Sequence, residues 1–453
     1  MMFLTYVAFL LLFFGPYNTY GLKKPKHDKV VVCYVASWAA YRPGNGAFSL
    51  DNLRPEHCTH LIYAFAGINP SNWTIKSLDP WADMEKNGIG NYRKMTALRK
   101  SGLKVSLGIG GWNEGSINFS MMASSSDNRK TFIASTVEFL RTYKFDGLDL
   151  DWEFPANRGG AKYDKENLVS LIKELRDAFR EYRFSLTAAI SANKDHIKMG
   201  YDIPEISKYL DYIHVMAYDY HGAWNNQVLP NAPMRSKDLL SVEDTIMYLL
   251  QQGAPAEKLV LGLAMYGRTF VLTTVPDTPK MNPIGMLSLD TGFKGPYTSE
   301  NGFMGFNEIC ETLVLHPQEW TTGWDNYSST AYAIKGDHVV VYDDRKAIMI
   351  KVEYVKKQKL AGVMVWSIDT DDFQGICSSL HDDMTSLDGR DYPLMKAINT
   401  ILTSTVPSEK KQSFPYEKAK GSSSHSSSVQ LSSNVAFALS ITIIYFSLYA
   451  YLS

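Results

Sequence analysis

Residues 145–154 read FDGLDLDWEF, an apolar run in which Asp149, Asp151 and Glu153 occupy alternate positions. Continuous apolar runs of this length are typical of strands buried on both faces of a parallel sheet. Seven similar runs occur at residues 30–38, 61–68, 105–112, 184–192, 212–220, 259–266 and 363–369. Apolar residues at helical spacing lie between several of them, at 128–144, 165–182, 241–252 and 344–357. This alternation predicts an α/β fold, a (β/α)8 TIM barrel.

The interval between the seventh and eighth strand candidates is too long for one loop and one helix. Within it, residues 276–298 are rich in Pro, Gly, Asp and Thr, and residues 338–341 have the composition of a strand. We therefore expect a small α+β insertion domain at about 268–341, carried by a barrel domain that spans 22–403.

The two ends of the chain differ from its middle. Residues 3–14 form a short apolar run that small residues and then lysine follow, which predicts a signal peptide at 1–21 rather than a buried helix. At the other end, a Ser-rich stretch at 421–428 precedes an uncharged apolar run at 435–452.

This second pattern predicts a stalk at 404–434, a glycosylphosphatidylinositol (GPI) attachment site near 421–424 and a removable tail at 435–453. The expected location is the secretory pathway and then the extracellular face of the plasma membrane. Plain secretion and a single C-terminal membrane-spanning helix are the alternatives.

The sequence contains four cysteines, Cys33, Cys58, Cys310 and Cys377. An even number in an exported chain predicts two disulfides, with three possible connectivities, of which pairing neighbours along the chain is the simplest. No Cys-x-x-Cys motif is present, and neither a metal nor a cofactor is expected. Glycosylation sequons begin at Asn72, Asn118 and Asn326.

The charges balance, with 46 Lys and Arg against 47 Asp and Glu. A net charge of -1 leaves no basic surface of the kind that binds nucleic acid. Nothing in the sequence requires an obligate oligomer, so we expect a monomer.

Side chains at alternate positions of a strand share a face, so Asp149, Asp151 and Glu153 should point the same way. The C-terminal ends of strands carry the functional side chains in such a barrel. Carboxylates this close cannot all ionise, so at least one pKa should rise, as a general acid near neutral pH requires. Helix capping, pairing with Lys or Arg, and a Mg or Ca site are the alternatives. They fit less well, because the run has no local cation and its neighbours are Trp and Phe rather than further oxygen ligands.

Aromatic residues mark the ends of the other strand candidates. They are Trp38, Phe65, Trp112, Tyr218, Tyr266 and Trp366. A single aromatic residue in a strand is usually part of the core. A ring of them around carboxylates instead predicts a cleft in which sugar rings stack and are cleaved.

These motifs resemble those of glycoside hydrolase family 18, whose acid signature is D-x-x-D-x-D-x-E. Residues 146–153 fit it, and residues 106–111 resemble the family's third-strand glycine segment with altered spacing. Residues 216–219, residues 266–268 and the strand around Trp366 follow in the family's order. Over about residues 30–401 the chain is similar to animal chitinases of the chitotriosidase and insect type. The resemblance implies retaining, substrate-assisted cleavage of β-1,4 bonds between N-acetylglucosamine units of chitin or chito-oligosaccharides.

The resemblance also implies roles for single residues. Glu153 would protonate the leaving glycosidic oxygen, Asp151 would orient the attacking acetamido group, and Asp149 would tune Asp151. Tyr218 would hydrogen-bond the acetamido oxygen. The implied substrate-binding residues are Tyr34, Trp38, Phe65, Gly111, Trp112, Met216, Asp219, Trp224, Tyr266, Arg268 and Trp366. The resemblance implies the disulfides Cys33–Cys58 and Cys310–Cys377 as well.

Two other functions stay open. The family includes lectins that bind chitin without cutting it, and these typically lack the catalytic acid that Glu153 supplies here. The other is an endo-N-acetylglucosaminidase that acts on a different glycan containing N-acetylglucosamine.

Overall fold

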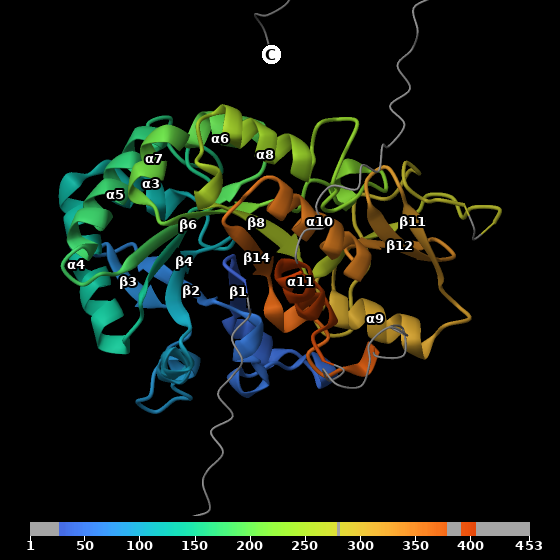
Figure 1. Cartoon of the computed structure of the whole chain (residues 1–453), viewed down its shortest axis with the longest axis horizontal. Coiled ribbons are helices and arrows are strands. Elements are labelled where there is room, and N and C mark those ends of the chain that lie inside the picture. The colour runs from blue at the N-terminus through green and yellow to red at the C-terminus, as the bar shows by residue number, and fades with distance from the viewer. Residues whose placement is uncertain (1–26, 279–280, 378–390, 405–453) are drawn as a thin grey trace, which may run out of the picture. The chain divides into compact units, whose positions relative to one another are not determined.

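The computed structural model describes residues 27–278, 281–377 and 391–404 (Figure 1). The predicted signal peptide, GPI attachment site and apolar tail lie outside these residues. Within the described ranges, no helix combines the length and the apolar character that crossing a membrane would need.

Eight parallel strands form a closed barrel. They are β1 (Val30–Ala36), β2 (His60–Asn69), β4 (Lys104–Gly110), β5 (Gly147–Asp151), β6 (Ser185–Ser191), β7 (Tyr212–Met216), β8 (Leu259–Ala264) and β14 (Gly362–Trp366). The barrel closes because β1 pairs with both β2 and β14. Each predicted apolar run overlaps one of these strands, and the (β/α)8 barrel is confirmed.

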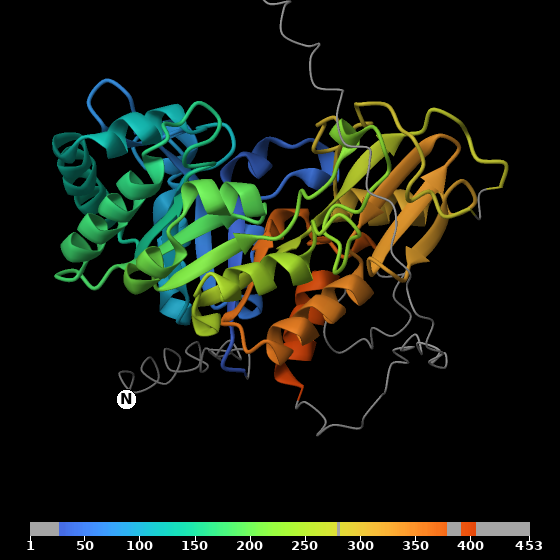
Figure 2. The same cartoon turned by 90° about the horizontal axis from the view of Figure 1, so that it is seen from above.

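Helices cover the outside of the barrel (Figures 1 and 2). They are α1 (Pro80–Asp83), α2 (Asn91–Ala97), α3 (Ile117–Ser124), α4 (Ser126–Tyr143), α5 (Asp164–Phe179), α6 (Lys194–Gly200), α7 (Ile203–Tyr209), α8 (Val242–Gln251), α10 (Arg345–Lys357) and α11 (Pro393–Thr403). On α5, apolar residues three and four positions apart form the buried face, which contains Leu168, Leu171, Ile172, Leu175 and Phe179. The helix predicted at 241–252 begins as its sequence indicates, because the Ser241 side chain accepts a hydrogen bond from the backbone N–H of Asp244.

A second, smaller sheet follows β8 in the chain. Its strands are β9 (Tyr266–Val271), β10 (Phe303–Gly305), β11 (Thr321–Asp325), β12 (Thr330–Lys335) and β13 (His338–Tyr342), and α9 (Phe306–Leu315) lies between β10 and β11. The strands are antiparallel in the order β10-β9-β13-β12-β11, and Figure 2 shows them beside the barrel. The predicted small second unit between strands seven and eight is therefore present. Because β9 starts two residues after β8 ends, this sheet extends from the C-terminal end of the barrel.

Among the described residues outside the insertion, one strand has no counterpart among the predicted elements. β3 (Thr74–Ser77) pairs antiparallel with the end of β2 and extends the barrel sheet outward. Its four residues, TIKS, contain one aliphatic side chain, which is too weak a pattern to identify a strand.

Two disulfides cross-link segments of the fold. Cys33 of β1 is joined to Cys58, and Cys310 of α9 is joined to Cys377, with Cα–Cα distances of 6.1 and 5.6 Å. The simplest of the three connectivities is thus confirmed. The second bond ties the small sheet's helix to the segment that follows β14.

The three sequons lie in different surroundings. Asn72 and Asn326 are exposed, whereas Asn118 is half-buried and donates from its side-chain amide to Glu114. Glycosylation at these asparagines stays a prediction.

Candidate active site

Three acidic side chains lie at the C-terminal end of β5. Asp149 and Asp151 belong to the strand, Glu153 follows it, and all three are buried. Burial, the charge of Glu153 and the charge of Asp149 together raise the pKa of Asp151 well above its ordinary value. The expectation that crowding would raise at least one carboxyl pKa is confirmed.

Asp149 differs from its neighbour because three strands supply it with partners. Tyr34 of β1 donates to its Oδ2 at 2.5 Å, and Thr187 of β6 donates to its Oδ1 at 2.5 Å. The Nδ1 atom of His214, on β7, lies 3.0 Å from the same Oδ1. Burial alone would raise the pKa of Asp149, but His214, Thr187 and Tyr34 outweigh it and hold this pKa below its usual value.

Glu153 has the properties of a general acid. Burial is the main reason that its pKa rises to about 7, the positive charge of Arg158 opposes the rise, and the negative charge of Asp219 adds to it. A carboxyl group with this pKa is about half protonated at neutral pH, so it can donate a proton and take one back there.

One oxygen of Asp151 has an unused hydrogen-bonding capacity. Its Oδ1 atom is buried, and no described residue forms a hydrogen bond with it. Buried acceptors in folded proteins are nearly always satisfied, so this atom is a candidate contact for a ligand N–H or O–H group.

Tyr218 follows β7 and borders the acids. Its pKa is raised well above the ordinary value, mainly by burial and then by the charges of Asp151 and Asp219. Its hydroxyl hydrogen points to the sulfur of Met364 at 3.7 Å. Sulfur is a weak acceptor, so this hydroxyl can turn towards a better one.

Asp219 connects this region to the small sheet. Tyr266 donates its hydroxyl to Oδ1 of Asp219 at 2.7 Å, and Arg268 forms an ion pair with the same atom at 2.6 Å. The Arg268 guanidinium also lies 5.2 Å from the centre of the Trp224 ring, which is 53% exposed. Arg268 thereby joins an exposed aromatic side chain to the acidic site.

Aromatic rings form a cluster beside the acids. The Trp366 ring lies 5.6 Å from the Tyr34 ring and 5.7 Å from the Phe65 ring, and the Trp38 ring lies 6.2 Å from Phe65 and 6.1 Å from Trp366. Phe65 and Trp366 are stacked at an interplanar angle of 21°. Met216 packs at the edge of the same cluster. Within this cluster Tyr34 is buried, whereas Trp38 is 43% exposed.

Gly111, just after β4, permits a close approach between the chain and this aromatic cluster. A Cβ atom at Gly111 would lie 2.5 Å from the Phe65 ring, and its φ of +82° favours glycine. Its backbone N–H donates to the Asp151 carbonyl at 2.9 Å. The next residue, Trp112, is 61% exposed.

The residues that the sequence indicated for this site differ in exposure. Asp219 is exposed, and intermediate exposure is found at Met216, Tyr218, Arg268 and Trp366. Tyr34 and Tyr266 are buried, each about 1% exposed, and support Asp149 and Asp219 from below. Trp38, Trp112 and Trp224 are exposed.

The sequence reasoning missed Thr187, His214 and Arg158. A polar side chain within an apolar strand, as at His214 in YIHVM, is the signal that could have identified one of them.

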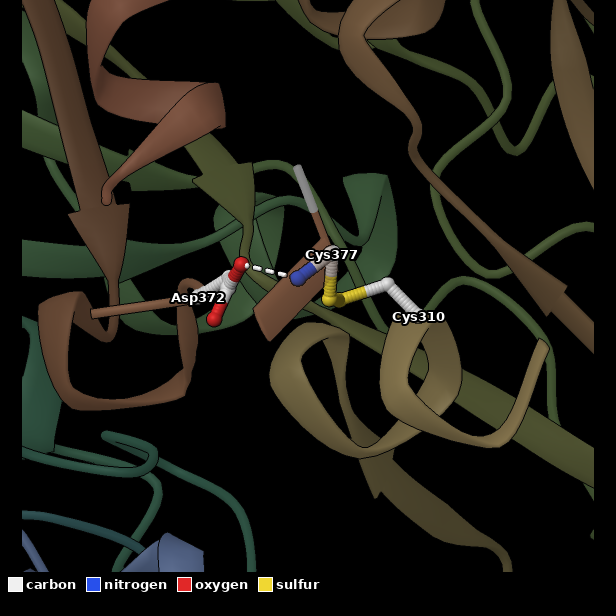
Figure 3. Close-up of side chains that lie close together, drawn as sticks. All are labelled: Cys310, Asp372 and Cys377. Carbon is white, nitrogen blue, oxygen red and sulfur yellow. Dashed lines mark hydrogen bonds between the residues drawn. A yellow bond between two sulfur atoms is a disulfide. The ribbon is translucent and has the colours of Figure 1, made fainter. Parts of the chain in front are cut away.

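One group of the described side chains has the spacing of metal ligands, but its two cysteines are bonded to each other. Among the described residues, one group has metal-ligand geometry, namely Cys310, Asp372 and Cys377 (Figure 3). The two sulfur atoms are joined in a disulfide and so are not thiolate ligands. Asp372 accepts hydrogen bonds from the backbone N–H groups of Ile376 and Cys377, so the group is a structural junction.

Comparisons with known proteins agree with this geometry. Residues 30–371 match the sequence profile described as glycosyl hydrolases family 18. The chain is 48% identical over 396 residues to "Probable chitinase 2" of Drosophila melanogaster, a match that covers 83% of this chain and 81% of that protein. It is 34% identical to "Chitotriosidase-1" of Mus musculus, over 84% of this chain and 79% of that one. A Group IV chitinase from Ostrinia furnacalis, solved in complex with allosamidin, is 40% identical with a TM-score of 0.76 and covers 83% of this chain and 100% of that one. The chain therefore belongs to glycosyl hydrolases family 18.

Proposed function

We propose that the chain is a chitinase that hydrolyses β-1,4 bonds between N-acetylglucosamine units of chitin or chito-oligosaccharides, with retention of configuration. Relatives named as chitinases in an insect and in a mammal support this substrate class. The allosamidin complex of the Ostrinia furnacalis chitinase supports a ligand site of the same kind.

The observation that carries the proposal is a buried, unsatisfied acceptor beside a general acid. Oδ1 of Asp151 needs a donor, and Glu153 has a pKa of about 7. The acetamido N–H of N-acetylglucosamine is such a donor, and the relatives named as chitinases favour it over a sugar hydroxyl.

In the first step, Glu153 gives its proton to the leaving glycosidic oxygen. The substrate's acetamido oxygen attacks the anomeric carbon as the glycosidic bond breaks, which forms an oxazolinium ion. In its carboxylate form, Asp151 accepts a hydrogen bond from the acetamido N–H and offsets the positive charge. Asp149 stays ionised beneath it, because its three donors stabilise the anion.

In the second step, Glu153 is a carboxylate and takes a proton from a water molecule. The resulting oxygen adds to the anomeric carbon on the face that the leaving group has left, and the acetamido group is released. Retention follows from two inversions, and Glu153 returns to its protonated form.

The surrounding side chains hold the sugar chain. The flat faces of Trp366 and Trp38 suit stacking against sugar rings on one side of the acids, and exposed Trp112 and Trp224 suit neighbouring rings. The Tyr218 hydroxyl would leave the weak sulfur contact and donate to the acetamido oxygen.

The test is hydrolysis of N-acetylglucosamine oligomers by the purified protein. We expect wild type to release shorter oligomers and Glu153→Gln to be slower by about 10²- to 10⁴-fold in kcat, the contribution of a general acid. Glu166→Gln, an exposed glutamate on α5, is the matched control and should keep wild-type rates. If wild type releases no shorter oligomers across about pH 4 to 8, the proposal that the chain is a chitinase is refuted.

Two alternatives are separated by the same assay. A chitin-binding lectin would bind oligomers but cut none, whereas the acid with its raised pKa favours cleavage. An endo-N-acetylglucosaminidase would cut glycoprotein glycan cores and leave chito-oligosaccharides intact.

We also propose that the protein enters the secretory pathway and is held at the cell surface by a lipid anchor attached within residues 421–424. The Ser-rich stretch and the apolar run after it support this. Phosphatidylinositol-specific phospholipase C should release the protein from cells. Retention of all the protein after both this treatment and acid cleavage of the anchor would contradict the proposal.

A further inference from the structure

Arg158 lies in the loop between β5 and α5 and contacts both the catalytic acid and an exposed tryptophan. One guanidinium nitrogen, Nη1, donates to the Trp112 carbonyl at 2.9 Å and to the Glu153 carbonyl at 3.0 Å. The guanidinium carbon lies 3.6 Å from the centre of the Trp112 ring. A single side chain therefore bridges the C-terminal ends of two barrel strands and covers one face of an indole.

The loop that carries Arg158 is held in place by a hydrogen bond to the buried Asp164. Asp164 is completely buried and accepts hydrogen bonds from the Ala156 backbone N–H at 3.0 Å and from the Ser120 hydroxyl at 2.6 Å. The backbone of Ala156 and of Arg158 has positive φ, at 60° and 49°, which reverses the direction of the chain after β5. Although its side chain is exposed, Arg158 thus starts from a constrained backbone.

The arrangement leaves one face of Trp112 for a ligand. Arg158 stacks on the indole, yet the side chain remains 61% exposed. A guanidinium over one face holds the ring in a single orientation and strengthens its role as a rigid platform. The same nitrogen holds the backbone of Glu153, so the platform and the acid are kept at a constant separation.

We propose that Arg158 is a positioning residue that locks the Trp112 ring, as a wall of the sugar-binding cleft, to the backbone of Glu153. This inference rests on the proposed function, because it requires that Trp112 contacts a bound sugar and that Glu153 transfers a proton. Arg158 touches neither reacting atom and acts through these two residues.

The charge of Arg158 adds a second effect. The groups that act electrostatically on or with Glu153 are Asp151 at the end of β5, Asp219, Tyr218, Tyr201 and Arg158. Arg158 is the cation among them, and it lowers the Glu153 pKa against burial and Asp219. Loss of the charge should raise this pKa and move the alkaline limit of activity to higher pH.

The test compares Arg158→Lys, Arg158→Gln and Arg158→Ala on long N-acetylglucosamine oligomers. We expect all three to raise KM by about two- to fivefold, the size of an exposed cation–π contact between an arginine and an indole. The alkaline limb of kcat should move to higher pH in the glutamine and alanine variants and stay in place in the lysine variant. Arg180→Ala, at the far end of α5, is the control and should change neither quantity.

A double-mutant cycle with Trp112→Ala separates positioning from general weakening. If Arg158 acts through the ring, Arg158→Ala should add no further increase in KM once Trp112 is alanine. An equal increase in both backgrounds, or an unchanged KM and pH limb in Arg158→Ala, would overturn the inference. So would a uniform loss of kcat that follows a lowered Tm.

Binding distinguishes failure of this inference from failure of the proposed function. An oligomer is titrated into Glu153→Gln and into Glu153→Gln/Arg158→Ala, and Kd should rise about two- to fivefold in the second. If wild type cuts nothing but Kd rises in this way, the enzyme proposal fails, and the part of the inference in which Arg158 positions Trp112 for sugar binding stands. If Kd is unchanged while wild type is active, only the Arg158 inference fails, and if no oligomer binds, both fail.

Discussion

Asp149 and Asp151 are two residues apart on β5, and their carboxyl pKa values are displaced in opposite directions. Both are buried, so burial does not explain the difference. Asp149 has Tyr34, Thr187 and His214 as partners, whereas Asp151 faces two carboxyl groups and has an unpaired oxygen. The strand therefore holds a carboxylate with a depressed pKa beneath a carboxyl whose pKa is raised, in part by the charge of Glu153.

Replacing Asp149 with Asn tests this arrangement. Without the lower charge, the pKa of Asp151 should fall, and the amide NH₂ group would face donors that can no longer all be satisfied. We expect kcat to drop by about 10- to 100-fold, the cost of removing a group that orients a functional residue. The measurement is kcat on an N-acetylglucosamine oligomer, and a value within about twofold of wild type would contradict the role of Asp149.

Tyr34→Phe should reduce stability in a pH-dependent way. A buried hydrogen bond to a charged group contributes about 1.5–3 kcal/mol, so the free energy of unfolding at pH 7 should fall by this amount. The folded pKa of Asp149 is depressed, so this stability is present above the unfolded value of about 4 and is lost as pH falls through the folded pKa. Urea unfolding at neutral and acidic pH measures the difference.

Tyr220→Phe is the matched control for this experiment. Its hydroxyl is buried and donates to the neutral Thr245 hydroxyl at 2.7 Å. The loss should be about 0.5–1.5 kcal/mol at every pH, because no carboxylate titrates with it. Equal pH dependence in the two variants would disprove the assigned link between Tyr34 and the charge of Asp149.

Local sequence patterns predicted the features that neighbouring residues determine, namely the buried strands and the shared face of the three acids. Burial on both faces produces continuous apolar strands, and strand alternation placed Asp149, Asp151 and Glu153 together. Tyr34 and His214 reach Asp149 from positions 115 and 65 residues away in the chain, and no spacing rule encodes such a contact. Arg158 was missed for the same reason, since an arginine in a polar loop gives no sign that it stacks on Trp112.

Removing the Cys310–Cys377 disulfide should lower the free energy of unfolding by several kcal/mol. The bond closes a segment with a sequence separation of 67, for which the chain-entropy account gives about 4 kcal/mol. We expect Cys310→Ser/Cys377→Ser to unfold at markedly lower urea concentration than wild type. Cys33→Ser/Cys58→Ser, with a separation of 25, should lose about 3.5 kcal/mol. An unchanged midpoint in the first variant would rule out this contribution.

The alkaline limit of activity should report the proton on Glu153. Its pKa of about 7 means that kcat/KM falls as pH rises through that value, because the acid loses the proton that it must donate. Asp219 contributes a negative charge that raises this pKa, so Asp219→Asn should move the limb to lower pH, opposite to Arg158→Ala. The side chain of Asp219 is 40% exposed, and solvent screening keeps the shift small.

The pH profile has to be measured separately from substrate affinity, since Asp219→Asn also breaks the contacts to Tyr266 and Arg268. A rise in KM is expected from that loss and carries no information about the acid. The limb of kcat under saturating oligomer isolates Glu153, because kcat follows the groups of the bound enzyme. A limb that moves to higher pH in Asp219→Asn would show that the charge of Asp219 does not act on Glu153 as the structure indicates.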